Sequence, residues 1–158
     1  MSTPDATGQT ATGSDVPKPG EVRLEVVTIP VSDVDRAKAF YEKLGWRLDI
    51  DLEPAEGIRI VQFTPPGSGC SVSFGTGITP AEPGSFQGSE LAVYDVDAAR
   101  EDLIGRGVEV SEVYHLDGGA PAPGPDPEGQ SYRTFASFKD PDGNTWQLQE
   151  IKERLPGR

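Results

Sequence analysis

The sequence is poor in the side chains that bind metals and form disulfides. Among its 158 residues it has one cysteine, Cys70, and one histidine, His115. A single cysteine can form neither an intrachain disulfide nor a cysteine-based zinc site, which agrees with a reducing compartment. Iron sites of the two-histidine, one-carboxylate type and zinc sites with two imidazoles need a second histidine. One chain therefore cannot build any of these sites, and we expect Cys70 to be a small core residue.

Long apolar runs and positive charge are also scarce. No stretch approaches the ~20 apolar residues that cross a bilayer, and the amino terminus lacks the basic start and apolar stretch of a secretory signal. There are 14 Lys and Arg against 26 Asp and Glu, which gives a formal net charge of −12. Such a surface repels nucleic acid and anionic membranes, and it favours solubility or a cationic small molecule. We expect a cytoplasmic protein with no nucleic-acid or membrane partner.

The two ends of the chain differ in composition from the rest. Residues 1–20 are rich in Thr, Gly, Pro, Ser and Ala and have no hydrophobic period, so they cannot bury enough apolar surface to offset their ordering entropy. We predict a disordered tail there, and a short carboxy-terminal tail over residues 153–158. Residues 21–152 are long enough for one folded body.

The folded body contains an internal repeat. Residues 31–37 (VSDVDRA) are echoed 62 positions later by residues 93–99 (VYDVDAA). A repeat of this length implies two copies of one supersecondary unit. We place module one at residues 21–80 and module two at residues 86–152.

Periodicity predicts the same order of elements in both modules. Each module begins with a β-branched segment, continues with a helix whose N-cap is Asp33 or Asp95, and ends with three short strands. The expected strands are residues 22–31, 46–51, 58–64 and 70–74 in module one, and 89–93, 108–115, 132–138 and 145–151 in module two. Residues 116–131 form a Gly/Pro-rich loop of a length typical of functional lids or disordered segments. The expected fold is α+β, with two tandem β-α-β-β-β modules.

Three features point to a known family: the paired modules, residues 31–45 (VSDVDRAKAFYEKLG), and the turn at residues 140–144 (DPDGN) before the last strand. Over roughly residues 21–152 the chain resembles the vicinal oxygen chelate superfamily. Its members include glyoxalase I, extradiol dioxygenases, fosfomycin-modifying enzymes and bleomycin-resistance proteins. The resemblance implies curved mixed sheets that enclose a cavity, but one fold hosts many functions. We interpret residues 140–144 as a tight hairpin turn with a structural role and no chemical one.

The resemblance also implies where a metal would bind. Its enzymes typically carry a His or Gln early in the first strand of each module and a Glu or His on each last strand. The repeat places Val26 and Gly88 at the first-strand positions, and counting from the turn glycines places Ser71 and Gln147 at the last-strand positions. None of these side chains is a strong metal ligand. We therefore expect no metal and no cofactor.

Strand alternation predicts a cavity wall of small and polar side chains instead. The candidate ligand-binding residues are Val26, Thr28, Arg59, Ser71, Ser73, Gly88, Glu90, Arg133, Gln147 and Gln149. An inward-facing Glu90 would need a partner, and a ligand cation is a suitable one. Glu90 and Glu150 remain a candidate pair for Mg²⁺ or Mn²⁺, although the alternation that turns Gln147 inward turns Glu150 outward.

The sequence leaves three functions open. We favour a metal-independent binding protein, similar to bleomycin-resistance proteins, with a role in antibiotic resistance. It would be a homodimer that sequesters a small molecule, such as a cationic or aromatic natural product. The alternative is a glyoxalase-like lyase, isomerase or metal-free oxygenase. It would use His115, whose unperturbed pKa is near neutrality, with Tyr114 or Tyr132 for proton transfer. A structural partner-binding module is the third, and it predicts collapsed sheets without a cavity.

Overall fold

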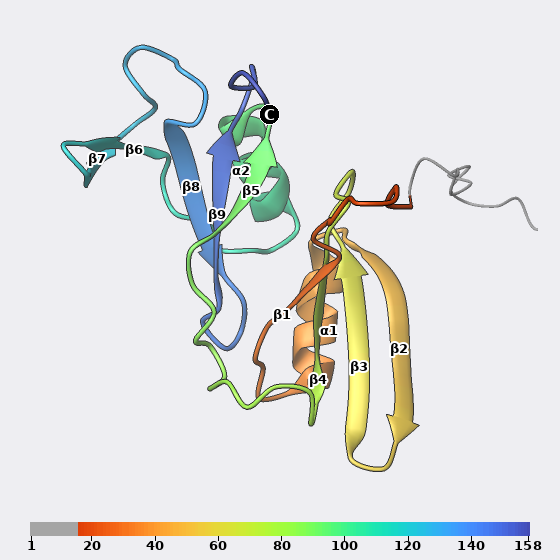
Figure 1. Cartoon of the computed structure of the whole chain (residues 1–158). Coiled ribbons are helices and arrows are strands. Elements are labelled where there is room, and N and C mark those ends of the chain that lie inside the picture. Colours follow the sequence, from red (N-terminus) through yellow and green to blue (C-terminus); the bar gives the residue numbers. More distant parts are fainter. Residues whose placement is uncertain (1–15) are drawn as a thin grey trace, which may run out of the picture.

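The computed structural model describes residues 16–158, so most of the predicted amino-terminal tail lies outside the described residues. Two mixed sheets, one of four and one of five strands, form two modules that lie side by side (Figure 1). This arrangement confirms the α+β fold with tandem modules. Within residues 16–158, no helix has the length and apolar character that a membrane span requires.

Module one follows the predicted order of elements. Its elements are β1 (Val26–Thr28), α1 (Val34–Lys43), β2 (Arg47–Ala55), β3 (Ile58–Thr64) and β4 (Ser71–Thr76), and its sheet has the order β1-β4-β3-β2. Asp33 caps α1, since its carboxylate accepts a hydrogen bond from Arg36 N at 3.0 Å. The first strand is shorter than expected because its only neighbour, β4, begins at Ser71, directly opposite Val26.

Module two repeats this order with one additional strand. Its elements are β5 (Ser89–Val93), α2 (Val96–Gly105), β6 (Tyr114–Asp117), β7 (Ala120–Pro123), β8 (Thr134–Lys139) and β9 (Thr145–Glu150), in the sheet order β5-β9-β8-β6-β7. The predicted strand at 108–115 forms only from Tyr114 onward. The predicted loop at 116–131 contains β7, and the β6–β7 hairpin extends away from the rest of the module (Figure 1).

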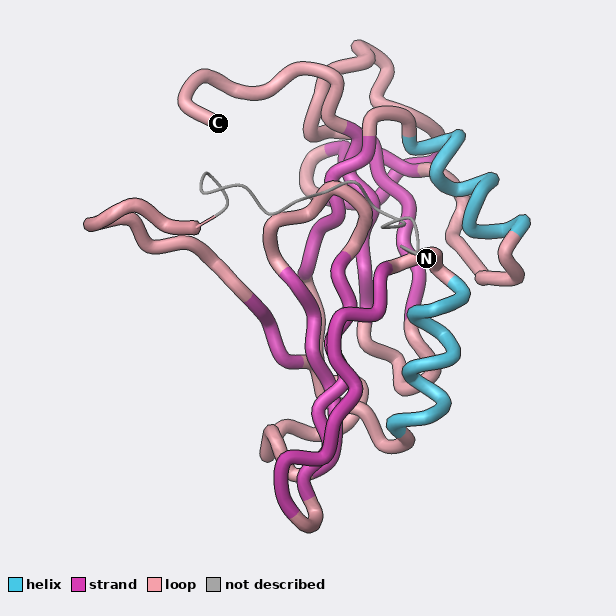
Figure 2. The backbone as a smooth tube through the Cα atoms, turned by 90° about the vertical axis from the view of Figure 1, so that its right-hand side faces the viewer, coloured by secondary structure: helices cyan, strands magenta, loops and turns pink. Residues whose placement is uncertain are grey.

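Both helices lie on the same side of the strands (Figure 2). One continuous hydrophobic cluster fills the space beneath them and includes Phe40 and Phe74 from module one and Trp146 and Leu148 from module two. The opposite face of each sheet carries no helix. We call it the open face, and strand alternation places every second side chain of each strand there.

A buried hydrogen-bond network joins the two modules. The Tyr41 hydroxyl donates to Asp140 Oδ2 at 2.9 Å and accepts from Trp146 Nε1 at 3.0 Å. Asn144 Nδ2 donates to Asp140 Oδ2 and to Pro30 O, both at 2.8 Å. We call Tyr41, Asp140, Asn144 and Trp146 the module clamp. The 140–144 turn thus does more than reverse the chain: it fixes module two against the helix of module one.

Candidate functional site

The open face of module one carries a row of hydroxyl groups. Val26 pairs with Ser71 and Thr28 with Ser73 in the parallel β1–β4 ladder. Thr28 Oγ1 lies 3.1 Å from Ser73 Oγ, and Ser71 Oγ lies 2.7 Å from Thr64 Oγ1. We call Thr28, Thr64, Ser71 and Ser73 the hydroxyl row. Each hydroxyl can both donate and accept, but Thr64, Ser71 and Ser73 are buried, so direct contact of the row with a ligand falls chiefly to the exposed Thr28.

Aliphatic side chains and one carboxylate surround the hydroxyl row. Val26 is 38% exposed and Leu52 is 45% exposed. Leu52 pairs with Ile60, which alternates with the fully buried Val61 and therefore lies on the open face. At the end of the row, Thr64 donates its hydroxyl hydrogen to Asp49. This face can therefore contact both apolar and polar parts of a small molecule.

The open face of module two carries an amide, a phenol and a carboxylate. Gln147 Nε2 donates to the Tyr114 hydroxyl at 2.6 Å, and that hydroxyl lies 2.7 Å from Ser137 Oγ. We call Tyr114, Ser137 and Gln147 the amide–phenol network. The Tyr114 ring stacks on Phe135 with their centroids 5.6 Å apart, which fixes the phenol. With its amide nitrogen engaged, Gln147 presents its carbonyl oxygen as a hydrogen-bond acceptor.

Glu90 lies opposite Gln147 in the β5–β9 ladder. The repeat predicted Gly88 as the counterpart of Val26, which is opposite Ser71 in module one. The cross-strand register instead gives that place to Glu90, because β5 begins after Gly88 and Gly88 has a φ of +84°, a conformation that favours glycine. A carboxylate therefore stands beside the Gln147 amide, where the repeat alone places a residue without a side chain.

The residues at the implied metal positions do not fit a divalent metal. These positions hold Val26, Ser71, Glu90 and Gln147. Only one of the four side chains is a carboxylate and none is an imidazole or thiolate, which is a weak donor set for zinc, iron or magnesium. Glu150 does not add to it, since its carboxylate accepts from Val96 N at 3.2 Å at the start of α2, on the helix side of the sheet. Across residues 16–158, no three His, Cys, Asp or Glu side chains are grouped so that they could hold a metal ion.

The three candidate catalytic residues are not brought together. Tyr114 belongs to the amide–phenol network, whereas His115 follows it on β6 and points to the other face. His115 Nδ1 lies 2.8 Å from Gly124 O and donates to it. Tyr132 packs near the carboxy terminus, where Leu155 N donates to its hydroxyl at 3.3 Å and is the main cause of its lowered pKa. No proton relay between His115 and either tyrosine follows from this arrangement.

The two candidate arginines are engaged in ion pairs. Arg59 lies on the helix side of β3, with Nη1 2.7 Å from Asp35 Oδ1 and Nε 3.0 Å from Asp51 Oδ1. Arg133 is exposed and lies 3.8 Å from Glu128. Neither guanidinium forms part of the hydroxyl row or of the amide–phenol network. Of the remaining candidates, Gln149 donates to the Tyr132 carbonyl oxygen at 3.3 Å.

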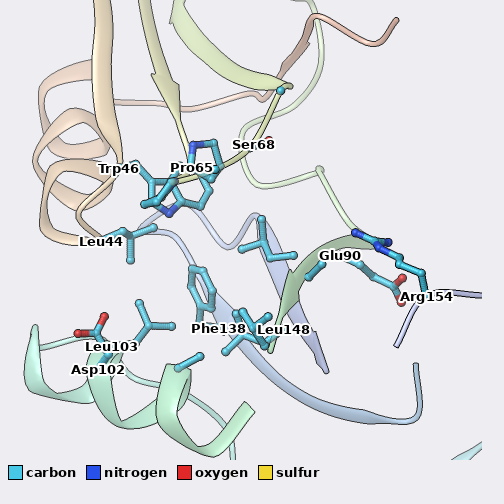
Figure 3. Close-up of a pocket in the computed structure, with 17 residues that line it drawn as sticks. Leu44, Trp46, Pro65, Ser68, Glu90, Asp102, Leu103, Phe138, Leu148 and Arg154 are labelled. Atoms are coloured by element: carbon cyan, nitrogen blue, oxygen red, sulfur yellow. The ribbon is translucent and has the colours of Figure 1, made fainter. Parts of the chain in front are cut away.

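A cavity of about 660 Å³ lies between the two modules. Leu44 and Trp46 of module one face Leu103, Phe138 and Leu148 of module two across it (Figure 3). We call it the inter-module cavity. It arises only when the modules pack together, so strand alternation within either module gives no signal for it.

The ends of the inter-module cavity are polar. Glu90 and Arg154 lie at one end, and Asp102 lies near the other (Figure 3). Of the ligand-binding residues predicted from the sequence, Glu90 alone lines this cavity. Glu90 thus borders both the cavity and the open face of module two.

Comparisons with known proteins agree with this architecture. The family model described as Glyoxalase/Bleomycin resistance protein/Dioxygenase superfamily matches residues 23–148. Comparison with the curated proteins gives no significant match.

Several solved structures are similar to the chain. TnmS3, an antibiotic binding protein from Streptomyces sp. CB03234, is 32% identical over 83% of this chain and 97% of its own, with a TM-score of 0.64. A glyoxalase/bleomycin resistance protein from the same Streptomyces is 32% identical, covering 81% of this chain and 100% of its own, with a TM-score of 0.62. A superfamily member from Sphaerobacter thermophilus DSM 20745 is 30% identical, covering 83% and 98%, with a TM-score of 0.65.

Proposed function

Since this chain belongs to the glyoxalase/bleomycin resistance protein/dioxygenase superfamily, we propose that it is a cytoplasmic, metal-independent binding protein that holds a small organic molecule without transforming it. The observation that carries this proposal is the set of side chains at the four implied metal positions. They offer hydrogen-bonding groups in place of a chelating site.

The polar groups on the open faces are arranged for recognition. The hydroxyl row and the amide–phenol network are each hydrogen-bonded within themselves, so their orientations are set before a ligand arrives. Preorganised donors and acceptors bind with a smaller ordering cost. The proton-transfer role considered for His115 has no support here, because its imidazole bonds to Gly124 O on the other face of the sheet.

A cationic or aromatic natural product is the ligand class that we propose. Glu90 offers an exposed carboxylate beside Gln147, and the whole chain has a formal net charge of −12. The half-buried Tyr114 ring, stacked on the buried Phe135, adds aromatic surface next to these acceptors. The antibiotic-binding description of TnmS3, a similar protein of 32% identity, supports a natural product and a role in antibiotic resistance.

We propose that a second copy of the chain completes the binding site. Two exposed aliphatic side chains, Val26 and Leu52, lie on the open face of module one. A homodimer could bring the open face of one copy against that of the other, which would bury this apolar surface and enclose a ligand cavity.

Native mass spectrometry of protein purified from its own source tests the proposal. We expect a retained small molecule, a dimeric mass, and no stoichiometric divalent metal by elemental analysis. The Gln147→Ala variant should retain at least tenfold less of the molecule, whereas Gln130→Ala, at an exposed site outside both open faces, should retain it fully.

The same preparation separates binding from catalysis. The released molecule is incubated with fresh protein and its mass is followed over many hours. A changed mass would replace the binding proposal by an enzymatic one, and stoichiometric metal would overturn metal independence.

A further inference from the structure

We propose that the inter-module cavity is a second ligand site, distinct from the open faces, and that it takes a planar aromatic cation. It shares Glu90 with the open face of module two, but its existence does not depend on the function proposed for the open faces. No member of the hydroxyl row or of the amide–phenol network lines it. Its walls are instead core-side groups: Leu103 from α2, and Phe138 and Leu148 from the helix-facing side of the second sheet.

The size of the inter-module cavity suits a small organic molecule. Its volume of about 660 Å³ falls within the range of roughly 300–1,000 Å³ that is typical of ligand pockets. Trp46 and Phe138 provide aromatic walls on opposite sides (Figure 3). A molecule with fused rings could contact both of them and would remove apolar surface from water.

The walls are held in place by packing elsewhere. The Trp46 ring lies 5.3 Å from Trp146 and 5.2 Å from Tyr41, between centroids, and both of these residues belong to the module clamp. The ring centroid of Phe138 lies 6.4 Å from that of Phe40. Closing the cavity by moving Trp46 would therefore disturb the buried contacts between the modules. This rigidity favours a preformed site.

A carboxylate lies at each end of the inter-module cavity (Figure 3). Glu90 and Asp102 contribute two carboxylates, against the single guanidinium of Arg154. Asp102 is ion-paired, since its Oδ2 lies 2.9 Å from Arg106 Nε. Arg154 also lies beside the Tyr132 hydroxyl and helps to lower the pKa of Tyr132. Indole is the best aromatic partner for a cation, and Trp46 supplies one. The site therefore combines the indole wall of Trp46 with the carboxylate of Glu90, the one of the two that is not ion-paired with Arg106.

Proflavine, a planar aromatic cation, is a suitable probe. The full chain has two tryptophans, so its indole N–H groups give two resonances in a ¹H–¹⁵N spectrum, and Trp46→Phe assigns them. We expect proflavine to shift the Trp46 resonance in a saturable manner with one molecule per chain. Acridine, the uncharged ring system at pH 8, should bind at least fivefold more weakly, and the aromatic anion 1-anilinonaphthalene-8-sulfonate more weakly still.

Ala99 provides a matched pair of variants. It lines the cavity from α2, whereas the neighbouring Ala98 is exposed on the same helix. Ala99→Phe should weaken proflavine binding at least tenfold and Ala99→Leu by a smaller factor, while Ala98→Phe should change it less than twofold. Thermal unfolding midpoints identify any variant that fails to fold, and the graded Ala99→Leu variant then carries the test.

Three results would overturn this second site: no saturable shift of Trp46, equal affinities for Ala99→Phe and Ala98→Phe, or binding of the anion as tight as that of proflavine. Gln147→Ala distinguishes it from the open-face function, since this variant should leave the Trp46 response unchanged. Loss of the natural ligand in Gln147→Ala tests only the open faces, and loss of proflavine in Ala99→Phe tests only the inter-module cavity.

Discussion

The hydroxyl of Tyr41 donates to the carboxylate of Asp140 at 2.9 Å, and this buried contact joins two residues 99 positions apart. Burial is the main cause of the raised pKa of Tyr41, and the Asp140 charge adds to it, so the phenol remains protonated and continues to donate. The contact sets the position of module two relative to α1. The inter-module cavity and the relative placement of the two open faces both depend on that position.

Replacing Tyr41 by Phe should destabilise the protein. The variant leaves a buried Asp140 oxygen and the Trp146 indole N–H each without one hydrogen-bond partner, which costs about 1–3 kcal/mol in the free energy of unfolding. Urea titration at pH 7 measures the loss. Tyr94→Phe is the control, because Tyr94 is 72% exposed and should unfold at the wild-type urea concentration. Equal midpoints for the two variants would contradict a structural role for the clamp.

Gly75 should tolerate no side chain. A Cβ built there would lie 1.8 Å from Arg59 O on the neighbouring strand, a backbone atom that cannot move aside without breaking the sheet. We expect Gly75→Ala to lose more than about 3 kcal/mol of unfolding free energy, or to fail to fold. Gly69→Ala is the matched control, since its Cβ would meet no atom within 4 Å. Urea midpoints of the two variants within error of each other would refute the β3–β4 packing.

The stability that Asp51 contributes should depend on pH. Hydrogen bonds from Arg59, and then from Lys38, hold the pKa of the Asp51 carboxyl well below its usual value. A carboxyl whose pKa is lower in the folded state contributes stability above its unfolded pKa of about 3.9 and loses it as pH falls through the folded value. Because the carboxyl is partly exposed, we expect Asp51→Asn to cost up to about 1 kcal/mol at pH 7.

Urea midpoints from pH 7 down to pH 3 measure this dependence. The difference between wild type and Asp51→Asn should narrow below about pH 4, because the Asp51 carboxyl of the unfolded wild type then binds a proton that the folded carboxyl does not. Glu53→Gln, on the same strand and exposed, should show no such trend. A difference that stays constant with pH would show that the Asp51 charge contributes nothing.

The sequence predicts those parts of the fold that local patterns control. Strand alternation places Phe74 and Leu148 in the core, and Asp33 and Asp95 cap their helices as their positions before apolar periods indicate. β7 was missed because its prolines are unfavourable in strands. Pro123 is tolerated there because β7 is the edge strand of its sheet, where a missing N–H breaks no ladder.

The site was less predictable because it depends on register and on module packing. The place of Glu90 opposite Gln147 follows from where β5 begins, and only the glycine at position 88 gives a local sign of that irregularity. The contact between Tyr41 and Asp140 crosses two modules, so no periodic pattern within either one reports it. The same holds for Trp46, whose indole packs edge-on against Trp146 of module two.

Leu52 tests whether the open face of module one is an interface between copies. It is 45% exposed on the open face of module one, and Ile104 on α2 is equally exposed at 45%, on the helix side. Placing a lysine in a buried apolar interface costs a large desolvation penalty, whereas a lysine on an exposed helix surface does not. We therefore expect Leu52→Lys to weaken self-association at least tenfold and Ile104→Lys to leave it unchanged. Sedimentation equilibrium measures the shift between the 16.9 kDa chain and its dimer. A wild-type protein that sediments only as the 16.9 kDa species would refute the homodimer, and equal association of both variants would place the interface elsewhere.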